Sequence, residues 1–109
     1  MDDSKPYDVG AVDDFASGCV VQVFAGDSAV ALYNLDGSLF ATSDACTHGS
    51  GSLSEGSICG EEIECAMHMG RFAIRTGKAT GAPCVVDLRT FRVQIQAGRV
   101  LLHGGGTAT

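Results

Sequence analysis

Two pairs of metal-ligating residue types stand close together in the middle of the chain. Cys46 and His48 are one residue apart, Cys65 and His68 are two residues apart, and residues 49–64 separate the pairs. Thiolates and imidazoles both bind iron, and in one kind of [2Fe–2S] cluster two histidines replace two cysteines on one of the two irons. We therefore predict one such cluster per chain, with Cys46 and Cys65 on one iron and His48 and His68 on the other.

The short spacing within each pair requires a bend in the backbone, because both side chains must turn toward one point. We expect each pair to lie at a loop tip, with positive φ at the glycines that follow it, which are Gly49, Gly51, Gly56 and Gly70. Hydroxyls beside the first pair could donate hydrogen bonds to the cluster sulfurs, and these belong to Thr47, Ser50 and Ser52.

Around these ligands the sequence resembles the Rieske ferredoxins that serve bacterial aromatic-ring-hydroxylating dioxygenases. Residues 46–56, CTHGSGSLSEG, resemble the first cluster loop of that family, and residues 63–72, IECAMHMGRF, resemble the second. Further similarity lies in Arg75–Lys78, Gly81–Pro83 and Phe91–Leu102, so the resemblance runs from about Tyr7 to Leu102. Ala66 stands where the family usually has proline, and Ala73 stands where an aspartate is common; neither removes a ligand.

Composition favours one small carrier domain. A chain of 109 residues forms a single domain, 1–109. No apolar run approaches the roughly 18–20 residues that span a bilayer, and the first residues lack the order of a signal peptide, so we expect a cytoplasmic protein that binds no membrane. The net charge of −6 disfavours nucleic acid and favours a partner with a basic docking surface.

The cysteine count fits a reducing compartment. The chain has five cysteines, an odd number, which is unlike a disulfide framework. Two are predicted ligands, and the others are Cys19, Cys59 and Cys84. We expect these three to be packed, inert thiols, with Cys59 the one that could be exposed because Gly60 and two glutamates follow it.

Short alternating segments and turn signals predict an all-β fold of antiparallel sheets, in a sandwich or partial barrel. Hairpin turns are expected at Asp36–Gly37 and Ala97–Gly98. The predicted strands are Val20–Phe24, Ala29–Leu35, Ser38–Thr42, Glu62–Cys65, Phe72–Arg75, Phe91–Gln96 and Arg99–Leu102. The resemblance implies the Rieske fold, with a cluster-binding subdomain at about 43–83 inserted in a larger base. Residues 104–109 are expected to be a disordered tail.

Electron transfer follows from what the predicted site lacks. An iron held fully by sulfides and protein ligands has no open position for substrate, and oxygenase chemistry would need a separate open iron. After the cluster claims two histidines only His103 remains, and we expect it at the surface. No phosphate loop or dinucleotide motif is visible. We therefore predict an electron carrier and not an enzyme.

The resemblance supplies the partners. It implies that a flavin-dependent ferredoxin reductase gives the electron and that a terminal Rieske non-haem iron oxygenase receives it. A shuttle that exposes its cluster to two partners in turn is most simply a monomer. The aromatic substrate is not readable from a carrier that never touches it.

The reduction potential of the predicted cluster is expected to be low. High-potential Rieske proteins add hydroxyl donors and a disulfide near the cluster, and those positions here are occupied by Gly70, Phe72, Gly51 and Met67. We therefore predict a midpoint of about −150 mV, the low end of the Rieske range.

Docking could be steered by acidic residues near the two loops, although an ordinary solvated face would have the same composition. These residues are Asp44, Glu55, Glu61, Glu62 and Glu64. Apolar contact is the alternative, through Met67, Met69 and Pro83.

Three other functions are compatible with the sequence. The chain could be a Rieske small subunit of another redox enzyme, which permanent association with one large partner would reveal. A structural Cys2His2 zinc domain is a second alternative, although in zinc fingers cysteines pair with cysteines. A regulatory or assembly module is the third, and the retention of all four ligands argues against it.

Overall fold

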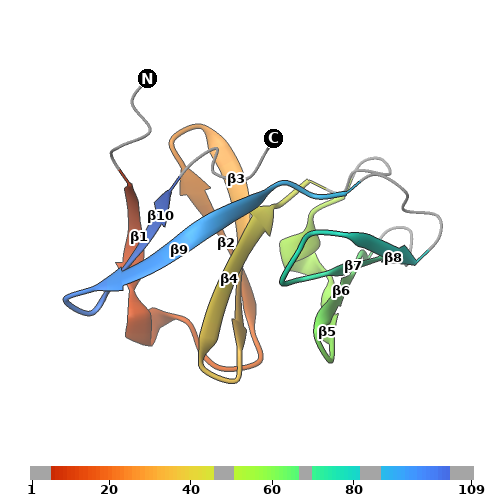
Figure 1. Cartoon of the computed structure of the whole chain (residues 1–109), viewed down its shortest axis with the longest axis horizontal. Helices are drawn as coiled ribbons and strands as arrows, with labels where there is room; N and C mark the ends of the chain where they lie inside the picture. The colour runs from red at the N-terminus through yellow and green to blue at the C-terminus, as the bar shows by residue number, and fades with distance from the viewer. Residues whose placement is uncertain (1–5, 46–50, 67–69, 82–86, 104–109) are drawn as a thin grey trace.

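The structure, a computed structural model, describes residues 6–45, 51–66, 70–81 and 87–103. These ranges form two antiparallel sheets side by side (Figure 1). The strands are β1 Tyr7–Ala11, β2 Val20–Ala25, β3 Ser28–Leu35, β4 Ser38–Ser43, β5 Ser57–Cys59, β6 Glu62–Glu64, β7 Arg71–Ala73, β8 Ala79–Gly81, β9 Thr90–Gln96 and β10 Arg99–His103. Two short 3-10 turns, η1 Val12–Asp14 and η2 Leu53–Glu55, complete the described elements. In these ranges no helix has the length and apolarity to cross a membrane.

The larger sheet, which we call the base, curls into a partial barrel. Its strand order is β1-β10-β9-β4-β3-β2, and its two edge strands, β1 and β2, contact each other. The Tyr7 side chain lies against the turn after β2, where a Cβ atom at Gly26 would be 3.3 Å from the tyrosine ring. The barrel is filled by Phe15, which follows η1, and by residues of the strands. The strand residues of this core are Ala25, Val30, Leu32, Ala41, Phe91, Val100 and Leu102.

Both predicted hairpin turns are confirmed. Asp36 and Gly37 have φ of 58° and 98°, and Ala97 and Gly98 have φ of 53° and 77°. Positive φ at both central residues is the type I′ geometry, whose twist matches the flanking strands. The turns therefore fix the registers of β3 with β4 and of β9 with β10.

The smaller sheet has the order β5-β6-β7-β8 and packs beside the base (Figure 1). Strand β3 separates two cores: Val30 and Leu32 point into the barrel, whereas Ala31 and Tyr33 point toward the smaller sheet. A strand covered on both faces needs a continuous apolar run, which residues 29–33 supply. The second core comprises Ala31, Tyr33, Leu53, Ile63, Cys65, Phe72, Ile74 and Leu88.

The chain enters the smaller sheet after β4 and returns before β9, and backbone hydrogen bonds join both crossings. Ser43 N–H donates to Arg89 O at 2.8 Å, and Leu88 N–H donates to Gly77 O at 2.7 Å. Gly77 has φ of 77°, and a Cβ atom there would lie 2.5 Å from Leu88 O. Glycine is therefore required at position 77 both for its conformation and for the close approach of the returning segment.

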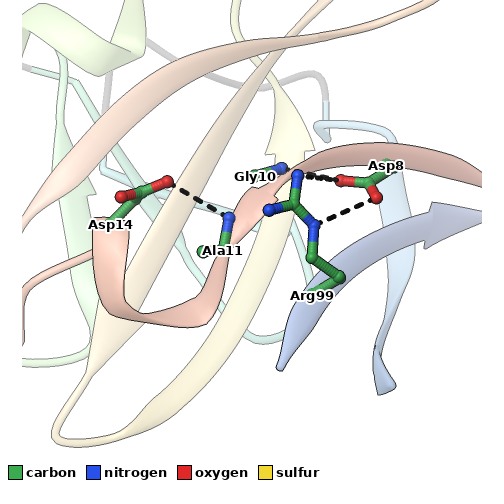
Figure 2. Close-up of polar contacts among 5 residues, drawn as sticks. All are labelled: Asp8, Gly10, Ala11, Asp14 and Arg99. Atoms are coloured by element: carbon green, nitrogen blue, oxygen red, sulfur yellow. Dashed lines mark hydrogen bonds and ion pairs between the residues drawn. The ribbon is translucent and has the colours of Figure 1, made fainter. Parts of the chain in front are cut away.

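Strand β1 is an edge strand of the base, and it pairs with β10, which lies at the other end of the chain. Arg99 on β10 donates two hydrogen bonds to Asp8, from Nε at 3.1 Å and from Nη2 at 2.9 Å (Figure 2). The Arg99 guanidinium holds the pKa of the Asp8 carboxyl below its ordinary value. Asp14 accepts the Ala11 N–H at 3.1 Å and so closes the turn after β1 (Figure 2).

The all-β prediction is confirmed, with differences in detail. Strands β1, β5 and β8 were not predicted. Strand β6 ends at Glu64 and not at Cys65, and β7 covers Arg71–Ala73 where Phe72–Arg75 was predicted. The predicted tail, 104–109, lies outside the described residues. The subdomain at about 43–83 stays a prediction, although β5 to β8 all lie within it.

Candidate metal centre

Of the four predicted ligands the structure describes Cys65. Cys46, His48 and His68 lie outside the described residues, as do Gly49, Thr47, Ser50, Met67, Met69 and Pro83. The described residues nevertheless include the last residues before and the first residues after each segment that carries a predicted pair. The first loop is residues 46–51, and we call the flanking residues 44–45 and 52–56 the first stem. The second loop is residues 66–69, and we call the flanking residues 64–65 and 70–71 the second stem.

The second stem is a closed hairpin. Cys65 directly follows β6, and its N–H donates to Gly70 O at 2.9 Å, just before β7 begins. The neighbouring pair Ile63 and Phe72 continues the ladder. The Cys65 side chain has no exposed surface and packs in the second core with Leu53. The sheet thus places this thiol at the end of a hydrogen-bonded hairpin, three positions before His68 in the sequence.

The first stem is also paired. Ala45 and Ser52 form an antiparallel bridge, and Leu53 N–H donates to Asp44 O at 2.7 Å. Gly51 has φ of 143°, in agreement with the bend expected there. Residues 46–51, which contain Cys46 and His48, therefore begin and end at neighbouring points of the backbone.

Asp44 is the polar centre of this first stem. It is 2% exposed, and both carboxylate oxygens accept hydrogen bonds. Oδ1 accepts the Ser54 N–H at 2.8 Å, and Oδ2 accepts Gln22 Nε2–H at 2.9 Å together with the Ser52 hydroxyl. Burial opposes ionisation of this carboxyl, but the hydrogen bonds from Ser52, Gln22 and Ser54 outweigh burial and hold its pKa below the ordinary value.

Two sequence-based expectations are corrected by this network. Asp44 was expected among exposed docking acids, but it is buried because it must accept donors from the loop stem. Ser52 was a candidate hydrogen-bond donor to cluster sulfur, but its single proton goes to Asp44, and its oxygen is 2.8 Å from Ser54 Oγ. Sequence reasoning missed the roles of Asp44 and Gln22, and the available signal was an aspartate at the end of an apolar strand, followed by two serines at 52 and 54.

The two stems touch at Gly56. This glycine was expected to adopt positive φ, which is wrong, because its φ is −88°. Glycine is needed there for space: a Cβ atom at position 56 would overlap the carbonyl oxygen of Glu64, the residue before Cys65. The end of the first stem therefore rests directly on the start of the second.

The remaining acidic residues divide into two groups. Glu61 is paired with Arg75 at 3.0 Å, and Glu62 lies 3.6 Å from Arg71. Glu55 is exposed, and Glu64 is half-buried. Of the five predicted docking acids, Glu55 and Glu64 are thus the two for which the structure gives neither burial nor an arginine partner.

The remaining cysteines and the third histidine are not among the predicted ligands. Cys19 was expected to be packed, which is wrong, because it precedes β2 in a turn and is exposed. Cys59 is half-buried, with Sγ 3.9 Å from Glu64 Oε1, and Cys84 lies outside the described residues. His103 ends β10 in the base, where Nε2 is 2.7 Å from Gln94 Oε1.

The described residues fit a [2Fe–2S] cluster. The two stems touch at Gly56, each stem is closed by backbone contacts, and the sequence gives one Cys/His pair to each stem and its loop. Two thiolates and two imidazoles are the donor set of the mixed cluster type.

Comparisons with known proteins agree with this site. Residues 5–92 match the family model described as the Rieske [2Fe-2S] domain. The chain is 42% identical over 95 residues to the ferredoxin component of the naphthalene 1,2-dioxygenase/salicylate 5-hydroxylase systems of a Ralstonia species, covering 87% of this chain and 91% of that protein. It is 44% identical over 97 residues to the ferredoxin component of the p-cumate 2,3-dioxygenase system of Pseudomonas putida, covering 87% and 82%.

A solved structure extends the agreement to three dimensions. A chain in the complex of reduced oxygenase and oxidised ferredoxin in carbazole 1,9a-dioxygenase superposes with a TM-score of 0.86 at 38% identity, covering 91% of this chain and 93% of that one. The matched lengths are nearly complete on both sides. The chain therefore belongs to the Rieske [2Fe-2S] family, and within that family to the ferredoxins.

Proposed function

We propose that this chain is a one-electron carrier of an aromatic-ring-hydroxylating dioxygenase system. It accepts an electron from a flavin-dependent reductase and passes it to the terminal oxygenase. Cys46, His48, Cys65 and His68 hold one [2Fe–2S] cluster, which supplies one-electron chemistry. The carrier itself converts no organic substrate, so it is not an enzyme.

The chain's own residues perform three tasks in this proposal. The thiolates and imidazoles fill every protein position on the two irons, and so leave no site for substrate or oxygen. The second core keeps water from the Cys65 side, because Leu53 and Phe72 pack there without exposed surface. The paired stems keep both loops in place through oxidation and reduction, which limits the rearrangement that each electron transfer requires.

The observation that carries the proposal is the closed hairpin at Cys65. Cys65 has no exposed surface and lies at the end of a strand, beside the stem of the first loop, which supports our assignment of this residue as a cluster ligand. The relatives named as ferredoxin components of dioxygenase systems support the same role. The ferredoxin–oxygenase complex of similar fold supports a terminal oxygenase as acceptor.

Electron transfer between purified components tests the proposal. Anaerobically reduced protein is mixed in a stopped-flow instrument with the oxidised terminal oxygenase of an aromatic dioxygenase system. We expect the carrier's visible absorption to return as the oxygenase Rieske centre is reduced, one electron per chain. In a redox titration we expect a midpoint of about −150 mV. A midpoint above about +100 mV, or no transfer to any such oxygenase, contradicts the proposal.

A free monomer is part of the same proposal. A carrier that alternates between two partners must leave each one, so it elutes alone at the size of one chain when purified from its native source. Elution in a stable complex with one large subunit would instead favour the Rieske small subunit of another redox enzyme. Stoichiometric zinc without iron would favour the structural Cys2His2 domain.

A further inference from the structure

We propose that Gln22 and Asp44 are positioning residues for the first ligand loop, through which the base strand β2 fixes the placement of Cys46 and His48. The inference rests on the proposed function, because it concerns a cluster held by those ligands. Neither residue is a ligand itself. Both act through the stem from which the loop rises.

The first argument is the arrangement of donors around Asp44. Its side chain joins two segments that are distant along the chain: β2 through Gln22, and the residues after the loop through Ser52 and Ser54. Its own backbone continues directly through Ala45 into Cys46. One carboxylate thus ties the entry of the loop, the exit of the loop and the base sheet together.

The second argument is that the hydrogen-bond partners of the Asp44 side chain are all donors. All three contacts come from donors, an amide N–H, a backbone N–H and a hydroxyl, and a carboxylate accepts with both oxygens. Asp44 is 2% exposed, so little water reaches its carboxylate in the folded protein. Removing the side chain would leave the Ser54 N–H without its partner, and the backbone contacts of the stem would then have to join the loop entry to the loop exit.

The third argument concerns Gln22. Its backbone pairs with Ala31 in the base, and its side chain reaches across to Asp44 Oδ2 at 2.9 Å. Gln22 is exposed and its strand is held by a complete ladder with β3, so shortening its side chain leaves the fold intact. Gln22 is therefore the position at which loop placement can be changed without disturbing the cores.

Substitution of Gln22 in the full holoprotein tests the inference. Gln22→Ala removes the donor, and Gln22→Glu replaces it with an acceptor of nearly the same shape facing Asp44. The matched control is Gln94→Ala, which removes another exposed strand glutamine whose side chain pairs, at 2.7 Å, with His103 in the base. Asp44→Ala is included for the size of the full effect, but it can unfold the chain, so Gln22 carries the test.

The readouts separate positioning from general stability. For each variant we would measure the melting temperature, the g-values of the reduced protein, and the rate at which the visible absorption is lost in the presence of an iron chelator. We expect Gln22→Ala to lose its cluster about tenfold faster than wild type. Mutating residues that support metal ligands weakens metal binding by about 10–100-fold, and we expect the lower end of that range. Gln22→Glu should be faster still, with shifted g-values, and Gln94→Ala should match wild type.

The inference is overturned, while the proposed function stands, if all three variants lose the cluster at the same rate and keep the wild-type g-values. These variants are Gln22→Ala, Gln22→Glu and Gln94→Ala. A fall in melting temperature that fully accounts for faster loss, with unchanged g-values, overturns it too, because a structural role predicts that result. Wild-type protein that binds no cluster under any condition overturns the proposed function, and this inference falls with it.

Discussion

The Gly56 backbone lies so close to the carbonyl oxygen of Glu64 that no Cβ atom fits between them. Gly56 ends the first stem, and Glu64 directly precedes Cys65. This contact, together with the second core to which Leu53 and Cys65 both belong, holds the two stems together by packing. High-potential Rieske proteins join the two loops by a disulfide, but this sequence has Gly51 and Met67 at those positions. Packing of the stems takes the place of that disulfide here.

Gly56→Ala is expected to push the two stems apart. Because both partners are backbone atoms, the structure must shift, and we expect a loss of about 2–3 kcal/mol in the free energy of unfolding and weaker cluster retention. Gly60→Ala, in the turn between β5 and β6, is the control: it has φ of 65° but open space around a Cβ atom. Denaturant unfolding compares them, and retention in Gly56→Ala equal to that in Gly60→Ala would contradict the packing role.

Tyr33 predicts a loss of stability in alkaline solution. Burial raises the pKa of Tyr33 far above its ordinary value, with its hydroxyl 2.8 Å from Thr42 Oγ1. A raised folded pKa stabilises the fold below the unfolded value of about 10, and this contribution is lost as pH rises above it. Thermal melts between pH 8 and pH 11 should show the decline.

Tyr33→Phe provides the comparison for that decline. The variant lacks the ionisable hydroxyl, so its stability should fall less steeply above about pH 10. At neutral pH it should cost about 1 kcal/mol for the lost hydrogen bond. A variant that declines with pH as steeply as wild type would exclude Tyr33 as the cause.

The Asp8–Arg99 pair on β1 and β10 predicts a measurable carboxyl titration (Figure 2). Arg99 lowers the pKa of Asp8, so the pair contributes stability above the unfolded pKa and loses it as pH falls through the lower folded pKa. In Arg99→Ala the NMR-monitored pKa of Asp8 should rise toward its ordinary value. An unchanged titration would show that another group sets it.

The salt dependence of the electron-transfer rate should arise from Glu55 and Glu64. If the acidic residues steer docking, electron-transfer rates fall about tenfold from low to physiological ionic strength. Glu55→Gln with Glu64→Gln should flatten this dependence. The control pair, Asp13→Asn with Asp36→Asn, removes two exposed charges from the base turns and should leave it unchanged. Equal salt slopes in both double variants would favour apolar docking instead.

The sequence predicted the parts of the fold that local chemistry determines. The Asp36–Gly37 and Ala97–Gly98 turns specify their own conformation, and the alternating residues beside them specify which face is buried. Strands β5 and β8 have three residues each, and β8 is a strand only because Arg71 and Phe72 lie beside it. Three residues are too few to show a periodicity, and β6 and β7, which are equally short, were predicted because they flank the second Cys/His pair.

The candidate site was predictable in its ligands and not in its supports. Cysteine and histidine announce metal binding by type and spacing, whereas Asp44 and Gly56 resemble an ordinary surface acid and an ordinary loop glycine. Their roles depend on Gln22 and Glu64, which lie 22 and eight positions away along the chain. Cys19 shows the converse error, since its valine neighbours belong to β2 but the cysteine itself lies in the exposed turn before it.

Low-temperature EPR of the dithionite-reduced protein, with iron, zinc and acid-labile sulfide analysis of the same anaerobic sample, tests the central claim most directly. The account predicts a rhombic signal with a low average g-value and about two irons and two sulfides per chain. Absence of the signal together with one zinc per chain would contradict the assignment of Cys46, His48, Cys65 and His68 as the ligands of a [2Fe–2S] cluster.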